Sequence, residues 1–184
     1  MIFRCVLAIL STVCLTAPAY PQKYEKLKYR TYEDTSRFTI SIPEDWTEEK
    51  SDKFAVIFYS KANDAYCTVK RTVDWSFGVM TNNDYVKHTV ENRKALVELL
   101  PLQFTANSGK LLTVAKFPIG DQIGAIIVTS GLMNDQNITS STYQIINASA
   151  LHTVGCYTLS ENIGYYFPIF STIGGSLTFS EITK

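Results

Sequence analysis

The sequence predicts an α+β domain built on a mostly antiparallel sheet. Several short segments alternate apolar and polar residues, as half-buried strands do. Two other segments repeat apolar residues at helical spacing. The order is strands, helix, strands, helix and strand, which differs from the regular strand–helix alternation of parallel folds. The chain has 184 residues, of which 46% are hydrophobic, so it suits one domain with a substantial core and not a disordered chain.

Residues 1–19 have the features of a secretory signal peptide. Arg4 supplies a positive start, Cys5–Leu15 is a run rich in apolar residues, and Ala17 and Ala19 are the small residues that signal peptidase requires. The run is well short of the roughly 20 residues that span a bilayer, and no later segment reaches that length. We therefore expect cleavage after Ala19, a secreted or periplasmic protein, and no stable membrane span.

A lipoprotein anchor at Cys14 is the alternative interpretation of this segment, but Val13 stands where such an anchor requires a small residue. The full chain has 17 basic and 17 acidic residues, and removal of Arg4 with the signal peptide leaves a mature chain of about one negative charge. This balance argues against a generic nucleic-acid binder or a polybasic membrane-surface binder. We expect no nucleic-acid partner.

The mature chain is expected to begin with an irregular arm and to continue into strands. Residues 20–34 are polar and dotted with aromatics but show no clean period, so the folded domain is expected over residues 35–184. Phe38–Ile42 alternates strictly and stops at Pro43, which is typical of a half-buried strand that ends in a turn. The turn is expected to fold Trp46 back onto that strand.

Two further strands and a helix are predicted next. Phe54–Tyr59 is a continuous apolar run that suits a strand covered on both faces. Tyr66–Trp75 alternates again, with Cys67 on its apolar side. Apolar residues then recur at helical spacing over residues 84–100, after residues suited to an N-cap, and Pro101 closes the segment.

The second half of the chain is predicted to form a hairpin, a polar loop, two strands, a helix and a final strand. In order, these are Leu111–Phe117 with Ile123–Ser130, the loop Asn134–Ser141, the strands Thr142–Ser149 and Leu151–Ser160, the helix Tyr166–Ile173 and the strand Ser176–Phe179. A five-residue loop, Pro118–Gln122, joins the hairpin. Gly174 and Gly175 are expected to end the helix.

Cys67 and Cys156 are the two cysteines left after removal of the signal peptide. An exported chain meets an oxidising compartment, where the two can form a disulfide. Such a bond would close a long loop and contribute roughly 4–5 kcal/mol on the chain-entropy model. The alternative is two free, buried thiols that act as small hydrophobic groups. The sequence leaves both possibilities open.

No strong catalytic, metal or cofactor motif is present, since HExxH, CxxC and GxSxG are all absent. His88 falls on the first predicted helix and His152 on a strand. His152 and Cys156 would share one strand face but lie roughly 13 Å apart, too far for a nucleophile and its base. We expect no enzyme and no cofactor.

Three weaker candidate groups remain. They are the acids Glu44, Asp45, Glu48 and Glu49, the aromatic clusters Tyr24, Tyr29, Tyr32 and Tyr165-Tyr166-Phe167, and the glycosylation sequons at Asn137 and Asn147. The acids lack the spacing of a calcium loop and predict a solvated turn. The second aromatic cluster is expected in the core, whereas the first is open to a role in binding sugars or partners. The sequons matter only in a eukaryotic secretory path.

The order of several short motifs resembles the PsbP-like and DcrB-like domains, a superfamily that includes a Ran-binding nuclear import factor. The matching residues are Phe38-x-Ile40-x-Ile42-Pro43-x-x-Trp46, Tyr157-x-Leu159 before a helix, and Ser176-Leu177-Thr178-Phe179, which resembles a terminal Ser-Phe-x-Phe. The resemblance spans roughly residues 30–180, and Leu177 and the Gly174-Gly175 pair depart from it. It implies an α/β/α sandwich, one antiparallel sheet covered by helices on both faces, and a binding or accessory role without catalysis.

The first functional hypothesis is an exported, non-enzymatic accessory or binding domain of the cell envelope or secretome, with a protein partner. The alternative is a secreted, lipocalin-like carrier of a small ligand, which requires a closed eight-stranded barrel. A helix over residues 84–100 fits that barrel badly, and a Gly-x-Trp motif near the first strand is absent. A small secreted hydrolase is the third hypothesis, and it requires a deep pocket around His152 or the acids of residues 44–49.

Overall fold

The computed structural model describes residues 27–35, 38–105 and 107–180, so the predicted signal peptide lies outside it. The strands are β1 (Tyr29–Glu33), β2 (Phe38–Pro43), β3 (Thr47–Glu49), β4 (Val56–Tyr59), β5 (Ala65–Val73), β6 (Lys110–Ile119), β7 (Gln122–Met133), β8 (Gln136–Asn147), β9 (Ala150–Leu159) and β10 (Thr178–Phe179). The helices are α1 (Trp75–Val79), α2 (Asn82–Glu91), α3 (Arg93–Gln103), the 3-10 helix η1 (Ser160–Asn162) and α4 (Ile163–Gly175).

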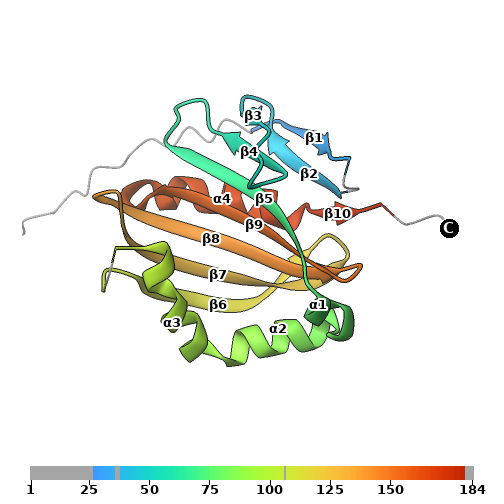
Figure 1. The fold of residues 1–184 in the computed structure, drawn as a ribbon. Coiled ribbons are helices and arrows are strands. Elements are labelled where there is room, and N and C mark those ends of the chain that lie inside the picture. The colour runs from blue at the N-terminus through green and yellow to red at the C-terminus, as the bar shows by residue number, and fades with distance from the viewer. Residues whose placement is uncertain (1–26, 36–37, 106, 181–184) are drawn as a thin grey trace, which may run out of the picture.

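Seven strands form one antiparallel sheet in the order β3-β4-β5-β9-β8-β7-β6, and β1-β2-β10 form a smaller sheet. In Figure 1, α4 lies behind the large sheet, while α2 and α3 lie at its β6 side. The predicted α+β class, with an antiparallel sheet and helices on both faces, is confirmed. The large sheet ends at β3 and β6, so the described residues do not form the closed barrel that the lipocalin-like alternative requires.

The main core lies between the large sheet, α4 and the small sheet. Phe38, Ile40 and Ile42 of β2 are all buried, as their alternation predicted. Trp46 is buried as well, and its ring lies 6.4 Å from the ring of Tyr166 on α4. A smaller cluster of Leu100, Phe104 and Ile138 fixes α3 to the other face of the sheet.

The single helix predicted over residues 84–100 is two helices, α2 and α3, that meet at Asn92. Asn92 leaves helical geometry at φ −96° and ψ 56°, and its side chain accepts a hydrogen bond from the Ala95 amide to cap α3. Pro101 lies inside α3 and does not end it. Trp75 was expected at the end of a strand, but it begins α1 because Asp74 caps that helix through the Ser76 amide.

The predicted loops are shorter than expected. Ile119 pairs with Gln122, so the turn that joins β6 and β7 has two central residues. The polar loop predicted over Asn134–Ser141 is wrong, because β8 begins at Gln136. Asn134 and Asp135 have φ of 51° and 62°, and they make the tight turn alone. Asn and Asp tolerate this left-handed geometry, which matches the twist of a hairpin.

Two N-terminal predictions also differ from the structure. Residues 29–33 of the expected arm form β1, which pairs with β2 along its whole length. The run over residues 54–59 is not covered on both faces, since only its C-terminal part forms β4, and burial alternates along that strand. Short strands depend on a partner strand for their hydrogen bonds. Their own alternation of apolar and polar residues is too brief to predict the strand.

Gly174 fixes the distance between α4 and the sheet, and its replacement by Ala is expected to destabilise the protein. An added Cβ would lie 2.3 Å from ring atoms of Tyr143, a fully buried residue of β8. Overpacking of this kind costs about 1–3 kcal/mol, more than the gain of up to about 1 kcal/mol from replacing glycine within a helix. Urea unfolding measures the difference.

Gly164→Ala is the matched control on the same helix, because its added Cβ meets no atom within 4 Å. We expect that variant to be as stable as the wild type or slightly more stable. Equal stability of Gly174→Ala and Gly164→Ala would contradict the close approach of α4 to Tyr143.

Candidate functional site

On the side of α2 and α3, these helices cover only part of the large sheet. Tyr85 of α2 donates a hydrogen bond to Gln144 of β8 at 2.7 Å, and Gln103 of α3 donates one to Ser140 of β8 at 2.9 Å. Both helices therefore lie over β6, β7 and β8. The strands β9, β5 and β4 follow β8 in the sheet and lie beyond the ribbons of α2 and α3, as Figure 1 shows. We call this region the open sheet face; its partly exposed side chains are Ile57, Tyr59, Tyr66 and Tyr157, and Thr68 among them is buried.

Three tyrosines form a row across the open sheet face. Tyr59 is paired in register with Tyr66, and Tyr66 is paired with Tyr157. Their ring centroids are 6.2 Å and 4.8 Å apart, and the rings of Tyr66 and Tyr157 are stacked with 16° between their planes. A Cβ at Gly155 would lie 3.1 Å from the Tyr157 hydroxyl, so the glycine leaves room for that ring to lie along β9.

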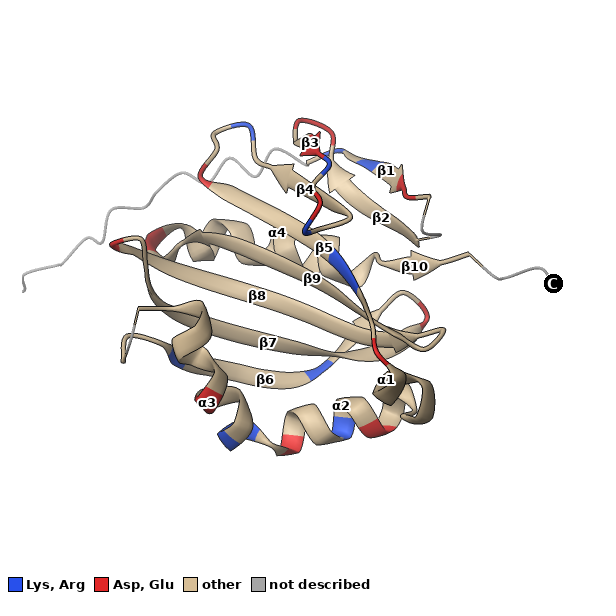
Figure 2. Cartoon of the chain, in the orientation of Figure 1, with Lys and Arg blue, Asp and Glu red and all other residues tan. Residues whose placement is uncertain are grey.

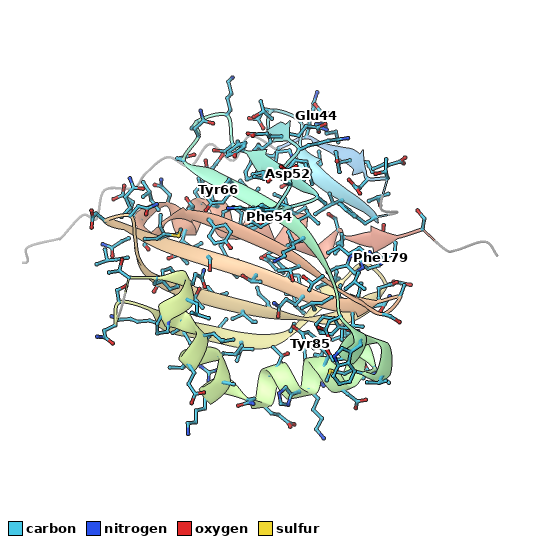
Figure 3. All side chains as sticks on the ribbon, viewed as in Figure 1. Glu44, Asp52, Phe54, Tyr66, Tyr85 and Phe179 are labelled. Atoms are coloured by element: carbon cyan, nitrogen blue, oxygen red, sulfur yellow. A yellow bond between two sulfur atoms is a disulfide. The ribbon has the colours of Figure 1, made fainter. Side chains whose placement is uncertain are left out.

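The row borders a shallow groove of about 310 Å³ that is mainly apolar. Its lining residues are Phe54, Ile57, Tyr59, Tyr66, Thr68 and Tyr157. Figure 3 labels Phe54 and Tyr66. The volume is at the lower end of the range for sites that enclose small ligands, roughly 300–1,000 Å³. The groove is therefore better suited to contact with a surface than to enclosure of a ligand.

The hydroxyl groups of this row stay protonated at physiological pH. Burial raises the pKa of Tyr66 to about 12, and the neighbouring Tyr157 and Tyr59 act in the same direction. Burial also raises the pKa of Tyr157. Burial and the nearby Glu49 carboxylate raise the pKa of Tyr59. The row thus offers neutral hydroxyls that donate and accept hydrogen bonds, set in an apolar groove.

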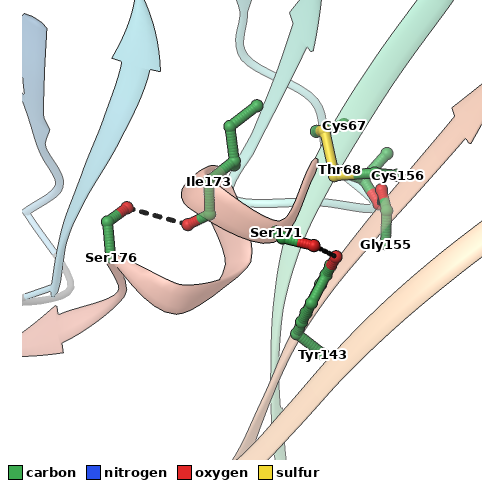
Figure 4. Close-up of a disulfide and its surroundings, with 8 residues drawn as sticks. All are labelled: Cys67, Thr68, Tyr143, Gly155, Cys156, Ser171, Ile173 and Ser176. Carbon is green, nitrogen blue, oxygen red and sulfur yellow. Dashed lines mark hydrogen bonds between the residues drawn. A yellow bond between two sulfur atoms is a disulfide. The ribbon is translucent and has the colours of Figure 1, made fainter. Parts of the chain in front are cut away.

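Cys67 and Cys156 lie directly beneath this row, on the opposite face of β5 and β9. Their sulfur atoms are 2.08 Å apart and their Cα atoms 4.0 Å apart (Figure 4). Each cysteine is adjacent in sequence to a tyrosine of the row, and neighbouring residues of a strand point to opposite faces. The disulfide therefore joins the two strands at the position from which Tyr66 and Tyr157 project.

His152 and Cys156 do share one face of β9, as their spacing predicted, but they do not form a reactive pair. Cys156 is bonded to Cys67. His152 is only 3% exposed, and its ring lies 4.4 Å from the ring of Phe179. Burial and the positive charge of Arg71 lower the pKa of His152 to about 4, although a backbone hydrogen bond at Asn147 acts in the opposite direction.

The acidic residues near β3 lie at the surface. Glu44 and Asp45 are exposed in the turn after β2, and Glu48 forms an ion pair with Arg30 at 2.9 Å. Within residues 27–35, 38–105 and 107–180, the structure brings together no group of three or more His, Cys, Asp or Glu suited to a metal ion. Figure 2 shows acidic and basic residues interspersed over the molecule.

The second aromatic cluster, expected in the core, has only Tyr166 there, and Tyr29 of the first cluster is half-buried. Tyr32 and Tyr166 are buried, whereas Tyr165 and Phe167 are partly exposed on α4, and Tyr24 lies outside the described residues. The tyrosine row of the open sheet face was missed, because its members come from three separate strands. Period-2 alternation along β5 does place Tyr66 and Thr68 together on one face. Only the register between strands adds Tyr59 and Tyr157.

The two sequons also lie on β8, one at each end of the strand. Asn137 is exposed and borders a polar pocket of about 500 Å³ that also includes Lys110 and Glu161. Asn147 is half-buried at the other end of the strand, before the turn into β9. Their glycosylation stays a prediction that depends on a eukaryotic secretory path.

No protein-family model and no curated protein matches this sequence. The structure is similar to CyanoP, the cyanobacterial PsbP of Synechocystis, with 13% identity and a TM-score of 0.54 over 86% of this chain and 96% of that chain. It is similar to LpqN of Mycobacterium tuberculosis, involved in cell envelope biogenesis, with 11% identity and a TM-score of 0.54 over 85% of this chain and 92% of LpqN. It is also similar to the Ran-binding protein Mog1p of Saccharomyces cerevisiae, with 10% identity and a TM-score of 0.50 over 78% of this chain and 84% of Mog1p.

These similarities establish the fold. The predicted resemblance to PsbP-like domains is confirmed at that level, over most of the length of each solved chain. The identities are too low to transfer an activity or a binding partner, because one fold serves many functions.

Proposed function

We propose that this protein is an exported, non-enzymatic accessory domain that binds a protein partner through the open sheet face. The observation that carries the proposal is the row of Tyr59, Tyr66 and Tyr157, which begins at the edge of the α3 cluster, where Tyr157 packs, and runs outward to Tyr59 of β4. Tyrosine is enriched in protein interfaces, where its ring supplies contact area and its hydroxyl supplies hydrogen bonds.

The arrangement of the rings favours a protein partner over a sugar. The rings of Tyr66 and Tyr157 are nearly parallel and stacked on one another, so each occupies one face of the other. A sugar would stack on a free ring face, whereas a protein surface can use the ring edges and hydroxyl groups that remain. The shallow groove beside Ile57 provides an apolar site into which a partner side chain can insert.

Two further observations support an exported accessory role. The sequence of residues 1–19 has the features of a signal peptide. LpqN, which shares the fold, is involved in cell envelope biogenesis, and Mog1p, which also shares it, binds a protein. We extend both properties, an envelope setting and a protein partner, to this chain as part of the proposal.

The double variant Ile57→Ser/Tyr59→Ser is expected to weaken partner binding roughly tenfold or more, because it removes the apolar wall of the groove and one end of the tyrosine row. Both side chains are half-exposed, so the free energy of unfolding is expected to change by no more than about 1 kcal/mol. The partner is first captured from the native envelope by cross-linking, and its affinity for the purified variants is then measured by calorimetry.

Leu99→Ser/Leu102→Ser is the matched control, because it removes two apolar side chains that are exposed on α3. Its affinity for the partner is expected to equal that of the wild type. Equal affinities for the open-face variant and the wild type would refute the proposed interface.

A further inference from the structure

Three strongly exposed apolar residues gather at one end of the molecule, away from the tyrosine row. Val73 at the end of β5 is 65% exposed, and Trp75 and Val79 of α1 are 82% and 80% exposed. We call Val73, Trp75 and Val79 the α1 tip. Helix α1 itself has no charged residue, as its sequence WSFGV and Figure 2 show.

The packing of α1 does not account for these side chains. None of its residues is buried. The helix is held by its cap, in which the Asp74 carboxylate accepts hydrogen bonds from the amide and hydroxyl of Ser76 at 2.9 Å and 2.7 Å, and by the ring of Phe77, which lies 6.5 Å from that of Tyr85. Polar residues at positions 75 and 79 would serve this short helix as well. A cluster of exposed apolar residues without a packing role marks a surface that another body covers.

The charged residues of β5 next to the α1 tip indicate what kind of surface the tip binds. Lys70 and Arg71 are exposed on β5, and neither forms an ion pair with any described residue; they outnumber the one carboxylate of the segment, Asp74, whose Oδ1 accepts the hydrogen bonds of Ser76. As neighbours on a strand, they project from opposite faces. At about 3.3 Å per residue they lie roughly 7–10 Å behind Val73 along the strand. An interfacial helix buries its apolar side about 5–10 Å deep, so these cations would lie among lipid headgroups.

We propose that the α1 tip docks onto an anionic lipid surface as a peripheral contact. Val73 and Val79 insert into the acyl boundary, Trp75 lies at the headgroup level, and Lys70 and Arg71 contact anionic headgroups. Tryptophan suits this depth because its ring is apolar and its indole N–H is polar. No helix of the described part of the chain is long and apolar enough to cross a membrane, and the proposed contact requires none.

The test uses vesicles of phosphatidylcholine with and without phosphatidylglycerol. The protein is purified in the form that accumulates in the producing cell, so that all variants share one N-terminus. We expect it to sediment with the anionic vesicles and to be released by salt. Fluorescence of Trp75 is expected to be quenched by brominated lipid, and Trp75→Phe identifies its signal because Trp46 is only 5% exposed.

Trp75→Ser/Val79→Ser is expected to lower the vesicle partition coefficient roughly tenfold or more. The control Leu99→Ser/Leu102→Ser and the open-face variant Ile57→Ser/Tyr59→Ser should both partition like the wild type. The proposal is overturned if the wild type does not bind anionic vesicles or if Trp75→Ser/Val79→Ser binds them equally well. It is likewise overturned if brominated lipid does not quench the fluorescence of Trp75. It is also overturned if position 75 cross-links to a protein while vesicles do not bind. None of these outcomes bears on the open sheet face.

Discussion

Reduction of the Cys67–Cys156 bond is expected to lower the free energy of unfolding by about 4–5 kcal/mol. The two cysteines are 89 residues apart in the chain. A cross-link over such a loop restricts the unfolded chain far more than the folded one, in which β5 and β9 are already paired. The loss would be a large part of the total stability of a domain of this size, which is typically about 5–15 kcal/mol.

Urea unfolding with and without reductant measures this effect. The variant Cys67→Ala/Cys156→Ala should be less stable than the oxidised wild type and should not respond to the reductant. Identical midpoints for the oxidised and reduced wild type would contradict the expectation. A native protein whose mass is about two protons higher, as two free thiols require, would show that the bond does not form.

Acidification is expected to destabilise the protein by about 3 kcal/mol through His152. Its pKa is lowered from 6.5 to about 4, first by burial and then by the charge of Arg71. Its Nδ1 atom has no hydrogen-bond partner among the described residues, and the backbone hydrogen bond at Asn147 offsets only part of the effect of burial. Each unit of pKa difference corresponds to about 1.4 kcal/mol.

The direction follows from which state takes up the proton. Above pH 6.5 the imidazole is neutral in both states, and this group has no effect. Between pH 6.5 and 4 the unfolded chain binds a proton that the folded protein does not, so the free energy of unfolding falls as the pH falls. Below pH 4 both states are protonated and the loss is complete.

Unfolding measured across this pH range for the wild type and His152→Leu isolates the contribution, because both proteins share all carboxylates. The variant should lose stability less steeply between pH 6.5 and 4. His88→Leu is the matched control, because it makes the same substitution at an exposed histidine on α2. Parallel pH profiles for the wild type and His152→Leu would refute the expectation.

The elements with strong periodicity could be predicted from the sequence. Phe38–Ile42 and the helix around Tyr166–Ile173 each bury one clean face, and both lie within the elements of the structure. Asn134–Ser141 was misread because a hairpin turn there needs only two residues and the polar strand that follows resembles a loop. The break at Asn92 was missed because the side-chain cap that begins α3 does not interrupt the apolar spacing.

The open sheet face could not be predicted for a different reason. Alternation assigns Tyr66 to one face of β5, but it does not say whether a helix covers that face. The break at Asn92 and the packing of Gln103 on Ser140 keep α2 and α3 over the β6 side of the sheet. Tyr59 and Tyr157 join the row only through strand register. The site is a consequence of tertiary arrangement.

The disulfide and the tyrosine row occupy opposite faces of the same strand pair, which connects the stability of the protein to its proposed function. Cys67 and Cys156 are matched in register, and so are Tyr66 and Tyr157 one position away. A bond beneath the row holds the two rings at a fixed spacing before a partner arrives. Preorganisation of this kind lowers the conformational entropy lost on binding.

Site-specific photo-cross-linking in the native envelope tests the central claim most directly. A photoreactive residue replaces Tyr59 on the open sheet face or, in a matched control, Leu99 on the exposed side of α3. The account predicts a defined covalent adduct with one protein from position 59 and none from position 99. Adducts from position 99 alone, or the same adducts from both positions, would contradict it.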